Sequence, residues 1–328
     1  LYKEFPLIGS ENFNLPLFIQ HKNFKPTEER DGLRTKKEDE VTQDATADNN
    51  RICLKDFINE YLPFITILIE SNCNNLHLLA LSGLPEFTEK FHNEDWYLEN
   101  IQKPIRKLIS EKAIVKNAEG NLILIKETRF PIIDLATDED FFELLEELIP
   151  DEVPSSESLN DWNKIINQEH HNWNNEVTIS LEQLLEGLPN YIDTTKYDTY
   201  QKLKKVYLFL ETKNSKLGES YPIYLNEKNE FKTRLDVSQY PEIDDEIKFV
   251  SKQLGKDLDD EFLNKQLGKV NEIKEFNLLD FYKSLNSDVI SPLKIEVATE
   301  EEIKAILHIN SLFKTDRATK RENWLDII

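Results

Sequence analysis

The residues best suited to polar chemistry lie close together near the start of the chain, between positions 24 and 32. Their order is Phe24-Lys25-Pro26-Thr27-Glu28-Glu29-Arg30-Asp31-Gly32, so charges of both signs adjoin one another. A guanidinium group such as that of Arg30 can hold phosphate or carboxylate oxygens through two parallel hydrogen bonds. The competing interpretation is a solvated turn whose charges pair locally, and composition alone favours that interpretation.

Residue types that bind metals are scattered. Histidine occurs at positions 21, 77, 92, 170, 171 and 308, and only Glu169-His170-His171 forms a cluster. Adjacent side chains on a helix or strand point in different directions, which is unfavourable for a shared metal ion. The sequence contains neither an H-E-x-x-H nor a C-x-x-C motif, so we predict no metal site.

Acidic and nucleophilic residues do not form a recognisable catalytic motif either. The carboxylates fit the solvated faces of amphipathic helices, and no serine or cysteine lies in a nucleophile elbow. Lys294-Ile295-Glu296 has the inverse of the Glu-x-Lys order that a paired-acid nuclease uses. The eight glycines all stand alone, which excludes a Walker loop and a dinucleotide fingerprint. We find no self-contained active site.

Composition restricts the partners and the compartment. Forty Lys and Arg against 62 Asp and Glu give a net charge of −22, which repels phosphate backbones and anionic lipids. Direct nucleic-acid binding and membrane binding are therefore not expected. Two cysteines and an apolar stretch too short to span a bilayer, around residues 62–69, predict a cytoplasmic protein. A chain that starts at Leu1 and has no methionine is expected to be a fragment.

Four landmarks recur in the same order and indicate an internal repeat of about a hundred residues. Each copy has a leucine-rich stretch, a Gly-Leu-Pro helix stop, a β-hairpin and an aromatic-Pro pair before an acidic helix. The paired segments are 82–87 with 186–191, 114–122 with 223–231, and 130–131 with 240–241. Gly120 in the first hairpin matches Asn229 in the second, and both residue types tolerate a positive φ in a tight turn.

Hydrophobic periodicity predicts the elements that must position these residues. Helices are expected over 54–70, 96–110, 139–149, 199–211, 243–254, 258–276 and 299–313. Pro63 should kink the first of these helices or divide it in two. The run of Leu15, Leu17, Phe18 and Ile19 has strand character, and residues 42–50 are predicted to be a linker or the approach to a helix.

The predicted fold is therefore α+β and predominantly helical. A short strand-bearing N-terminal segment precedes two tandem helix–β-hairpin–helix repeats and a helical C-terminal tail. The expected divisions are a junction segment over 1–50, repeat units over 51–155 and 156–262, and the tail over 263–328.

Part of the sequence resembles a known family. The residues that carry the resemblance are Phe5-Pro6-Leu7-Ile8-Gly9-Ser10-Glu11-Asn12-Phe13, Leu15-Pro16-Leu17, and Asn23-Phe24 with Pro26-Thr27-Glu28-Glu29-Arg30-Asp31-Gly32. This stretch resembles bacterial ATP-binding proteins of the sacsin and No-Vein class, within the GHKL superfamily of ATPases that includes the ninety-kilodalton heat-shock chaperone. Residues 221–260 are similar to the downstream part of such proteins, less specifically.

The resemblance implies a role at the junction with a nucleotide-binding lobe. The Asn-bearing helix, the Asp-x-Gly-x-Gly element and the glycine-rich lid of that lobe do not occur in this sequence. ATP and Mg²⁺ would thus bind to a lobe that precedes these residues, and no cofactor is expected here. The resemblance makes Arg30 the candidate that approaches the γ-phosphate or docks onto the lobe, with Lys25 and Arg34 as lesser candidates. Asp31 stands where some relatives have a second arginine.

Three functions follow as hypotheses. The first is a non-catalytic transducer or regulatory region of a larger GHKL-type ATP-binding protein, a class whose bacterial members are often associated with defence against foreign DNA. The second is a stand-alone protein-interaction scaffold without ATP linkage. The weakest is a hydrolase or nuclease built from scattered carboxylates. The first two imply a protein partner.

Overall fold

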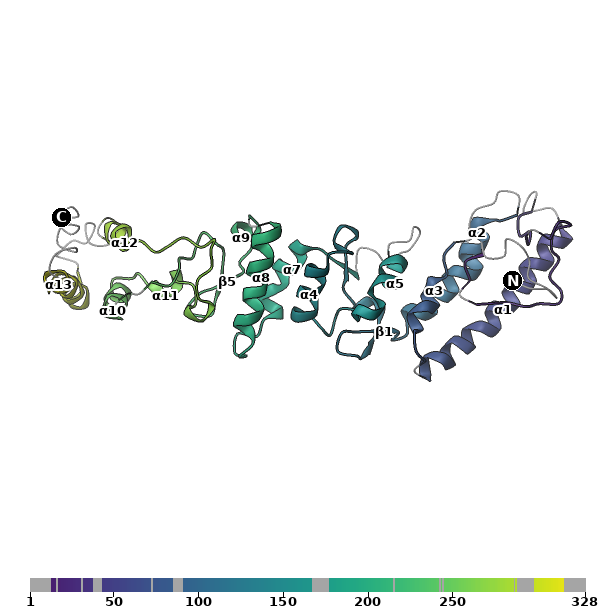
Figure 1. Ribbon diagram of the computed structural model, residues 1–328, viewed down its shortest axis with the longest axis horizontal. Helices are drawn as coiled ribbons and strands as arrows, with labels where there is room; N and C mark the ends of the chain where they lie inside the picture. Colours follow the sequence, from purple (N-terminus) through teal and green to yellow (C-terminus); the bar gives the residue numbers. More distant parts are fainter. Residues whose placement is uncertain are drawn as a thin grey trace. The chain divides into compact units, whose positions relative to one another are not determined.

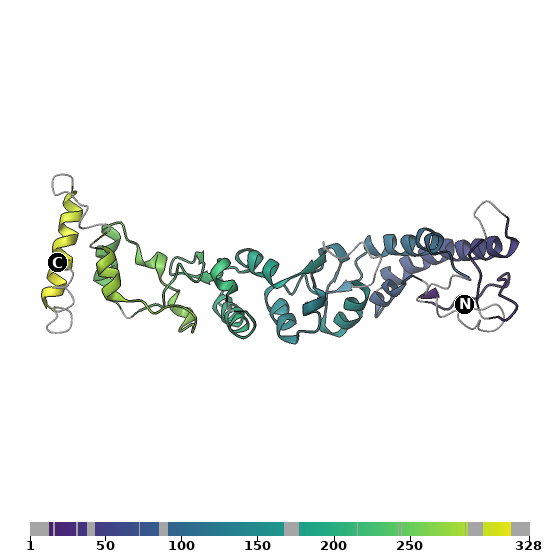
Figure 2. The ribbon, with the colours of Figure 1, turned by 90° about the horizontal axis from the view of Figure 1, so that it is seen from above.

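The computed structural model shows a predominantly helical chain with a few short strands, so the predicted α+β, mostly helical class is correct (Figure 1; the view from above is Figure 2). The residues that the structure describes are 13–15, 17–30, 32–37, 43–71, 73–84, 91–166, 177–214, 216–241, 243, 245–285, 287 and 298–315. The chain divides into two compact units, residues 1–180 and 181–328, and each is described by itself.

The first unit begins with a long helix, α1 (Ala45–Glu70). Asp44 caps it by accepting hydrogen bonds from the amides of Thr46 and Ala47, so the helix starts within the segment predicted as a linker. It continues through Pro63 without interruption, and a division into two helices there is therefore wrong. Its buried face contributes Leu54, Ile58, Tyr61 and Ile65 to the core of this unit.

Three short helical elements adjoin one another between residues 94 and 110. They are α2 (Glu94–Tyr97), the π-helical turn η3 (Leu98–Gln102) and α3 (Lys103–Ser110), which together confirm the helix predicted over 96–110. The 3₁₀ helix η2 (Leu76–Leu81) ends before Ser82, as the first Gly-Leu-Pro stop predicts, although residues 85–90 lie outside the described part.

The rest of the first unit surrounds two small sheets. Strands β1 (Val115–Lys116) and β2 (Leu122–Ile123) pair antiparallel, and β3 (Phe130–Pro131) pairs parallel with β4 (Thr178–Ile179). The remaining elements are η4 (Ile125–Glu127), η5 (Ile133–Leu135), α4 (Glu139–Leu148) and α5 (Ser156–Ile166). Trp162 and Phe130 are fully buried here, with ring centroids 5.5 Å apart.

The second unit, like the first, contains helices and a short antiparallel hairpin. Its elements are α7 (Leu181–Tyr191), α8 (Thr199–Lys213), α9 (Leu217–Ser220), β5 (Tyr224–Leu225), β6 (Phe231–Lys232), α10 (Asp245–Gln253), α11 (Leu258–Glu261), η6 (Lys265–Leu267), α12 (Leu278–Leu285) and α13 (Glu300–Thr315). Strands β5 and β6 pair antiparallel, so both predicted hairpins are confirmed. Helices α8, α10 and α13 match predicted helices within a few residues.

Three predictions about local structure are wrong. The second Gly-Leu-Pro sequence does not stop a helix, because α7 continues through Gly187 and Pro189. Residues 258–276 form a single helical turn and a 3₁₀ turn joined by irregular chain. The apolar run that includes Phe18 and Ile19 forms no strand among its described residues; Ile19 is buried and Phe18 is exposed.

The two hairpins belong to a larger structural repeat that we call the first hairpin unit (residues 114–158) and the second hairpin unit (residues 223–267). Residues at equivalent positions are 109 apart in sequence. In the first hairpin unit the side chain of Asn117 is buried. Its Oδ1 accepts a hydrogen bond from the amide of Asn121 at 2.8 Å, and its Nδ2 donates to the carbonyl of Asp151 at 2.9 Å.

The second hairpin unit contains the same arrangement at the equivalent residues. The buried Asn226 accepts from the amide of Glu230 at 2.8 Å and donates to the carbonyl of Asp260 at 3.1 Å. One side chain therefore joins the hairpin to the segment that returns beside it, in both copies. The predicted pair at the turn is confirmed as well, since Gly120 and Asn229 have φ values of 90° and 62°.

Candidate functional site

The predicted site residues lie in a turn that we call the cationic turn (residues 24–37). A β-bridge pairs Pro26 with Leu33, and the amide of Arg30 donates to the carbonyl of Thr27 at 3.0 Å. The buried side chains of Phe24 and Leu33 attach its two arms to the core of the first unit. Arg30 lies at the exposed tip with a φ of 58°.

The buried side chain of Asn50, on α1, is hydrogen-bonded to both arms of the turn. Its Oδ1 accepts from the amide of Lys25 at 2.9 Å, and its Nδ2 donates to the carbonyls of Lys25 at 2.9 Å and Arg34 at 3.0 Å. Without these bonds, backbone groups at the base of the turn would lose their partners, and buried unpaired polar groups are costly. Asn50 therefore couples the cationic turn to the first turns of α1.

The structure brings two of the three candidate cations to the start of α1. The Arg34 guanidinium forms an ion pair with Asp44 at 3.2 Å, and the Lys25 ammonium lies 3.5 Å from the carbonyl of Ala45. The pKa of Asp44 is lowered, mainly by the hydrogen bond from the amide of Ala47 and also by the nearby Arg34. Lys25 and Arg34 therefore hold the turn in place, whereas Arg30 is exposed at its tip, away from these contacts.

Arg51 also supports the turn, and sequence reasoning missed both Asn50 and Arg51. The buried Arg51 donates from Nε to the carbonyl of Thr35 at 2.7 Å, and its guanidinium lies over the ring of Trp96, 5.2 Å from the centroid. Asn50 and Arg51 adjoin a polar segment without periodicity, so nothing in the local pattern indicated that they are buried.

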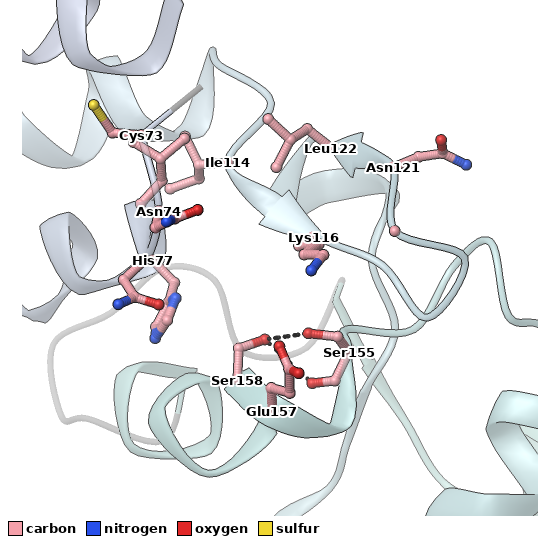
Figure 3. A pocket seen from close by; sticks show the side chains of 13 residues that line it. Cys73, Asn74, His77, Ile114, Lys116, Asn121, Leu122, Ser155, Glu157 and Ser158 are labelled. Carbon is pink, nitrogen blue, oxygen red and sulfur yellow. Dashed lines mark hydrogen bonds between the residues drawn. The ribbon is translucent and has the colours of Figure 1, made fainter. Parts of the chain in front are cut away.

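A second feature is a cavity of about 690 Å³ in the first unit, between residues 73–77 and the first hairpin unit (Figure 3). Polar side chains dominate its wall, among them His77, Lys116, Ser155, Glu157 and Ser158. We call it the hairpin hollow. No sequence motif had indicated a binding role for these residues.

The wall of the hairpin hollow contains hydrogen-bonding and charged side chains, and its described residues form no hydrolytic triad. His77 Nε2 lies 3.1 Å from a carboxylate oxygen of Asp161, and the pKa of Asp161 is lowered chiefly by this hydrogen bond. The hydroxyl groups of Ser155 and Ser158 lie 3.1 Å from each other. In the described part of the chain, no hydroxyl or thiol of this wall is hydrogen-bonded to His77.

The described residues contain no group of three or more His, Cys, Asp and Glu side chains arranged to hold a metal ion. Glu169-His170-His171, for which no shared metal ion was predicted, and the inverted pair at 294–296 lie outside the described part. Among the described helices, none has the length and apolar character needed to cross a membrane.

Comparison of the chain with protein-family models, with curated proteins and with solved structures finds no significant match.

Proposed function

We propose that this chain is a non-catalytic transducer region of a larger GHKL-type ATP-binding protein in the cytoplasm. In this proposal a preceding lobe of the same polypeptide binds ATP and Mg²⁺, and the cationic turn senses the nucleotide state of that lobe. The resemblance of residues 5–32 to sacsin and No-Vein proteins motivates it. The observation that carries it is the attachment of the cationic turn to α1 by Asn50.

The structure supports a mechanical link from the turn to the core. Arg30 is exposed at the tip, where an incoming phosphate or carboxylate could reach it, while Asn50, Lys25 and Arg34 fix the base. Helix α1 has 26 residues and supplies a row of side chains to the core of the first unit. A displacement of the turn would therefore be transmitted along α1, since closely packed interiors transmit strain.

The alternative, a protein-interaction scaffold without ATP linkage, is favoured by a different observation. Near the end of α1, Phe64 and Ile67 are about half exposed, at 48% and 58%, and they lie one helical turn apart. Adjacent exposed apolar side chains are typical of surfaces that contact another protein. Both functions require a protein partner, and they differ in whether nucleotide changes the turn.

Replacement of Arg30 by alanine in the full-length protein tests the transducer function. A guanidinium that contacts a transferring phosphoryl group changes turnover by orders of magnitude. We expect Arg30→Ala to lower the rate of ATP hydrolysis at least tenfold, roughly, with ATP affinity nearly unchanged. Lys22→Ala removes an exposed cation just before the turn and is the matched control. Equal hydrolysis by wild type and Arg30→Ala would remove Arg30 from this role, and absence of any ATPase activity would favour the scaffold.

A further inference from the structure

The hairpin hollow has eight wall positions within the first hairpin unit, and seven of them hold a different residue in the second hairpin unit. In order along the chain, the residues change from Lys116, Gly120, Asn121, Leu122, Ser155, Glu157 and Ser158 to Leu225, Asn229, Glu230, Phe231, Asn264, Gln266 and Leu267. Several backbone hydrogen bonds recur at equivalent positions, among them those donated by the amides of Ser155 and Asn264. The chain then differs, since α5 follows in the first unit and the 3₁₀ turn η6 in the second. The side chains that surround this space differ as well.

In the second hairpin unit, three of these positions are occupied by buried side chains, those of Leu225, Asn264 and Leu267. Leu225 and Leu267 are buried, at 0% and 2% exposed. Asn264 donates from Nδ2 to the side chain of Asn229 at 3.2 Å, which joins the turn to η6. In the first unit the turn residue is Gly120, and a Cβ added there would meet no atom within 4 Å. The first unit thus keeps space that the second unit uses for its own side chains.

The hollow also keeps two opposite charges that the second unit lacks. Figure 3 shows Lys116 on β1 and Glu157 in the first turn of α5 facing the same space. They form no ion pair with each other, and in the described part of the chain neither pairs with another residue. Both positions are neutral in the second unit, where they are Leu225 and Gln266. The one charge gained there, Glu230 in place of Asn121, is already paired with Lys232 at 3.1 Å.

We propose that the hairpin hollow binds a small zwitterion of amino-acid or short-peptide chemistry. The ligand's carboxylate pairs with the ammonium of Lys116, and its ammonium pairs with the carboxylate of Glu157. The hydroxyl groups of Ser155 and Ser158 supply further hydrogen bonds, and Leu122 provides apolar contact for a side chain. The volume of the hollow falls within the range typical of small-molecule sites. This proposal does not depend on the coupling of the cationic turn to a nucleotide.

The test uses the full chain and ligand-observed NMR with each common L-amino acid and a panel of L-dipeptides. The best binder of each group is then titrated by calorimetry. Its N-acetyl derivative lacks the ammonium group and its C-terminal amide lacks the carboxylate. We expect each derivative to bind roughly tenfold more weakly than the parent zwitterion. The two parent groups distinguish free amino acids from short peptides as the source of the shared chemistry.

Substitution of the hollow residues by the equivalent residues of the second unit tests whether the ligand binds in the hollow. Lys116→Leu and Glu157→Gln should each weaken the parent zwitterion roughly tenfold. The double variant Gly120→Asn with Ser155→Asn should abolish binding by filling the hollow, while circular dichroism confirms that it is folded. Lys126→Leu and Glu111→Gln change exposed charges outside the hollow and are the matched controls.

Three results would overturn the proposal. The first is that no zwitterion binds the wild-type chain. The second is that the N-acetyl or amide derivatives bind as tightly as the parent, since one of the two charges would then have no role. The third is that the folded Lys116→Leu and Glu157→Gln variants bind as the controls do, because the ligand would then occupy another site.

Discussion

The first and second hairpin units share several backbone hydrogen bonds, yet they differ in the side chains around them. In both units a buried asparagine joins the hairpin to the returning segment, and the turn contains one residue with a positive φ. The amide of Ser155 donates to the carbonyl of Lys116 at 2.8 Å, and the equivalent bond, from Asn264 to Leu225, has the same length. The frame therefore tolerates large changes in the side chains around it.

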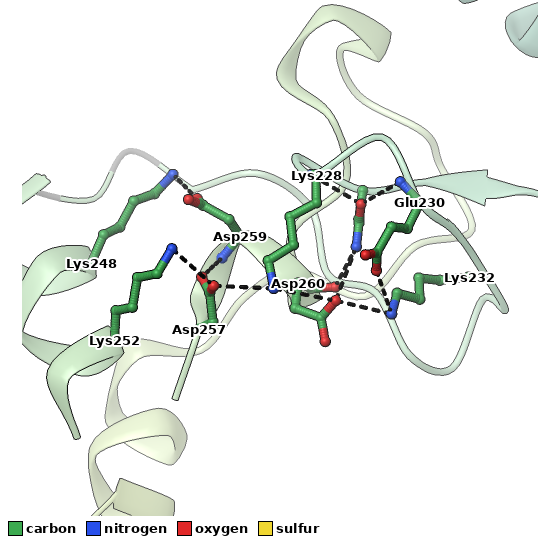
Figure 4. A network of polar contacts seen from close by, with 9 residues as sticks. Lys228, Glu230, Lys232, Lys248, Lys252, Asp257, Asp259 and Asp260 are labelled. Atoms are coloured by element: carbon green, nitrogen blue, oxygen red, sulfur yellow. Dashed lines mark hydrogen bonds and ion pairs between the residues drawn. The ribbon is translucent and has the colours of Figure 1, made fainter. Parts of the chain in front are cut away.

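In the second hairpin unit, several of the side chains around the hairpin form ion pairs (Figure 4). Asp257 pairs with Lys228 at 3.0 Å, and Asp260 pairs with Lys232 at 2.9 Å; Lys248 also reaches Asp259 at 2.8 Å. These contacts connect the hairpin, α10 and α11. Within the first hairpin unit, Arg129 pairs with Glu152 at 3.3 Å. Ion pairs connect the segments of the second hairpin unit, whereas the first hairpin unit has an open, polar hollow.

The largest expected effect comes from removing the asparagine that both units share. Asn117→Ala and Asn226→Ala should each lower the free energy of unfolding by about 2–3 kcal/mol, because buried backbone groups lose their partners. Urea denaturation followed by circular dichroism measures this loss. Asn121→Ala, at an exposed position of the first turn, is the control. A loss below about 0.5 kcal/mol in either variant would show that the asparagine does not hold the frame.

A smaller effect is expected at the turn. Gly120→Ala should cost about 1 kcal/mol, because alanine is strained at a φ of 90°. Gly120→Asn introduces the residue type of the second unit, which tolerates this region better, and should cost less than half as much. The same denaturation experiment compares the two variants. Equal stability of the two variants would contradict a positive φ at residue 120.

The smallest effect concerns the ion pairs and appears in the pH dependence. The pKa of Asp260 is lowered, mainly by its hydrogen bond with Lys232, from a usual value of 3.8. A lowered pKa in the folded state contributes stability above the unfolded-state pKa, and this contribution is lost as the pH falls through the folded-state value. The second unit should therefore lose this contribution below about pH 4.

Asp260→Asn should remove the part of the acid-dependent loss of stability that comes from this carboxylate. At pH 7 it should lower the free energy of unfolding by less than about 1 kcal/mol, because the ion pair with Lys232 is partly exposed. The matched variant is Asp151→Asn, at the equivalent exposed position of the first unit. Denaturation at pH 3 and pH 7 should reveal a change in pH dependence for Asp260→Asn alone. The same change in both variants would contradict the assigned role of the ion pairs.

Local sequence signals predicted the repeated frame well. The apolar–turn–apolar pattern located both hairpins, and the match of Gly120 with Asn229 identified the turn residue with a positive φ. Hydrophobic periodicity located the longer helices, since their buried faces are continuous in sequence. These features depend on short-range stereochemistry, which a single sequence displays directly.

The wrong predictions have physical reasons in contacts that are distant in sequence. In the segment 258–276, Phe262 and Leu263 form bridges to Ser238 and Asn226, and Gly268 has a φ of 69°, so a continuous helix cannot form. Gly187 is not a helix stop. The ring of Tyr191 lies 2.6 Å from where a Cβ of residue 187 would be, so the glycine permits this close approach within α7.

Candidate site residues were only partly predictable, for the same reason. The charge density of residues 24–32 pointed to Arg30, whereas the roles of Asn50 and Arg51 depend on contacts with a turn about 16 to 25 residues away. Lys116 and Glu157 line the same hollow only because the hairpin lies beside the start of α5 in the folded chain. Neither residue has a distinguishing neighbour in sequence.

Hydrogen exchange in the full-length protein measures whether the cationic turn is coupled to α1. Addition of ATP should change the exchange of amides in residues 24–37 and in the first turns of α1 at least severalfold. In an Asn50→Ala variant that remains folded, the change should persist at the tip of the turn and disappear in α1. Unchanged exchange of both segments in the wild type on addition of ATP, at a concentration that saturates the protein, would contradict the account.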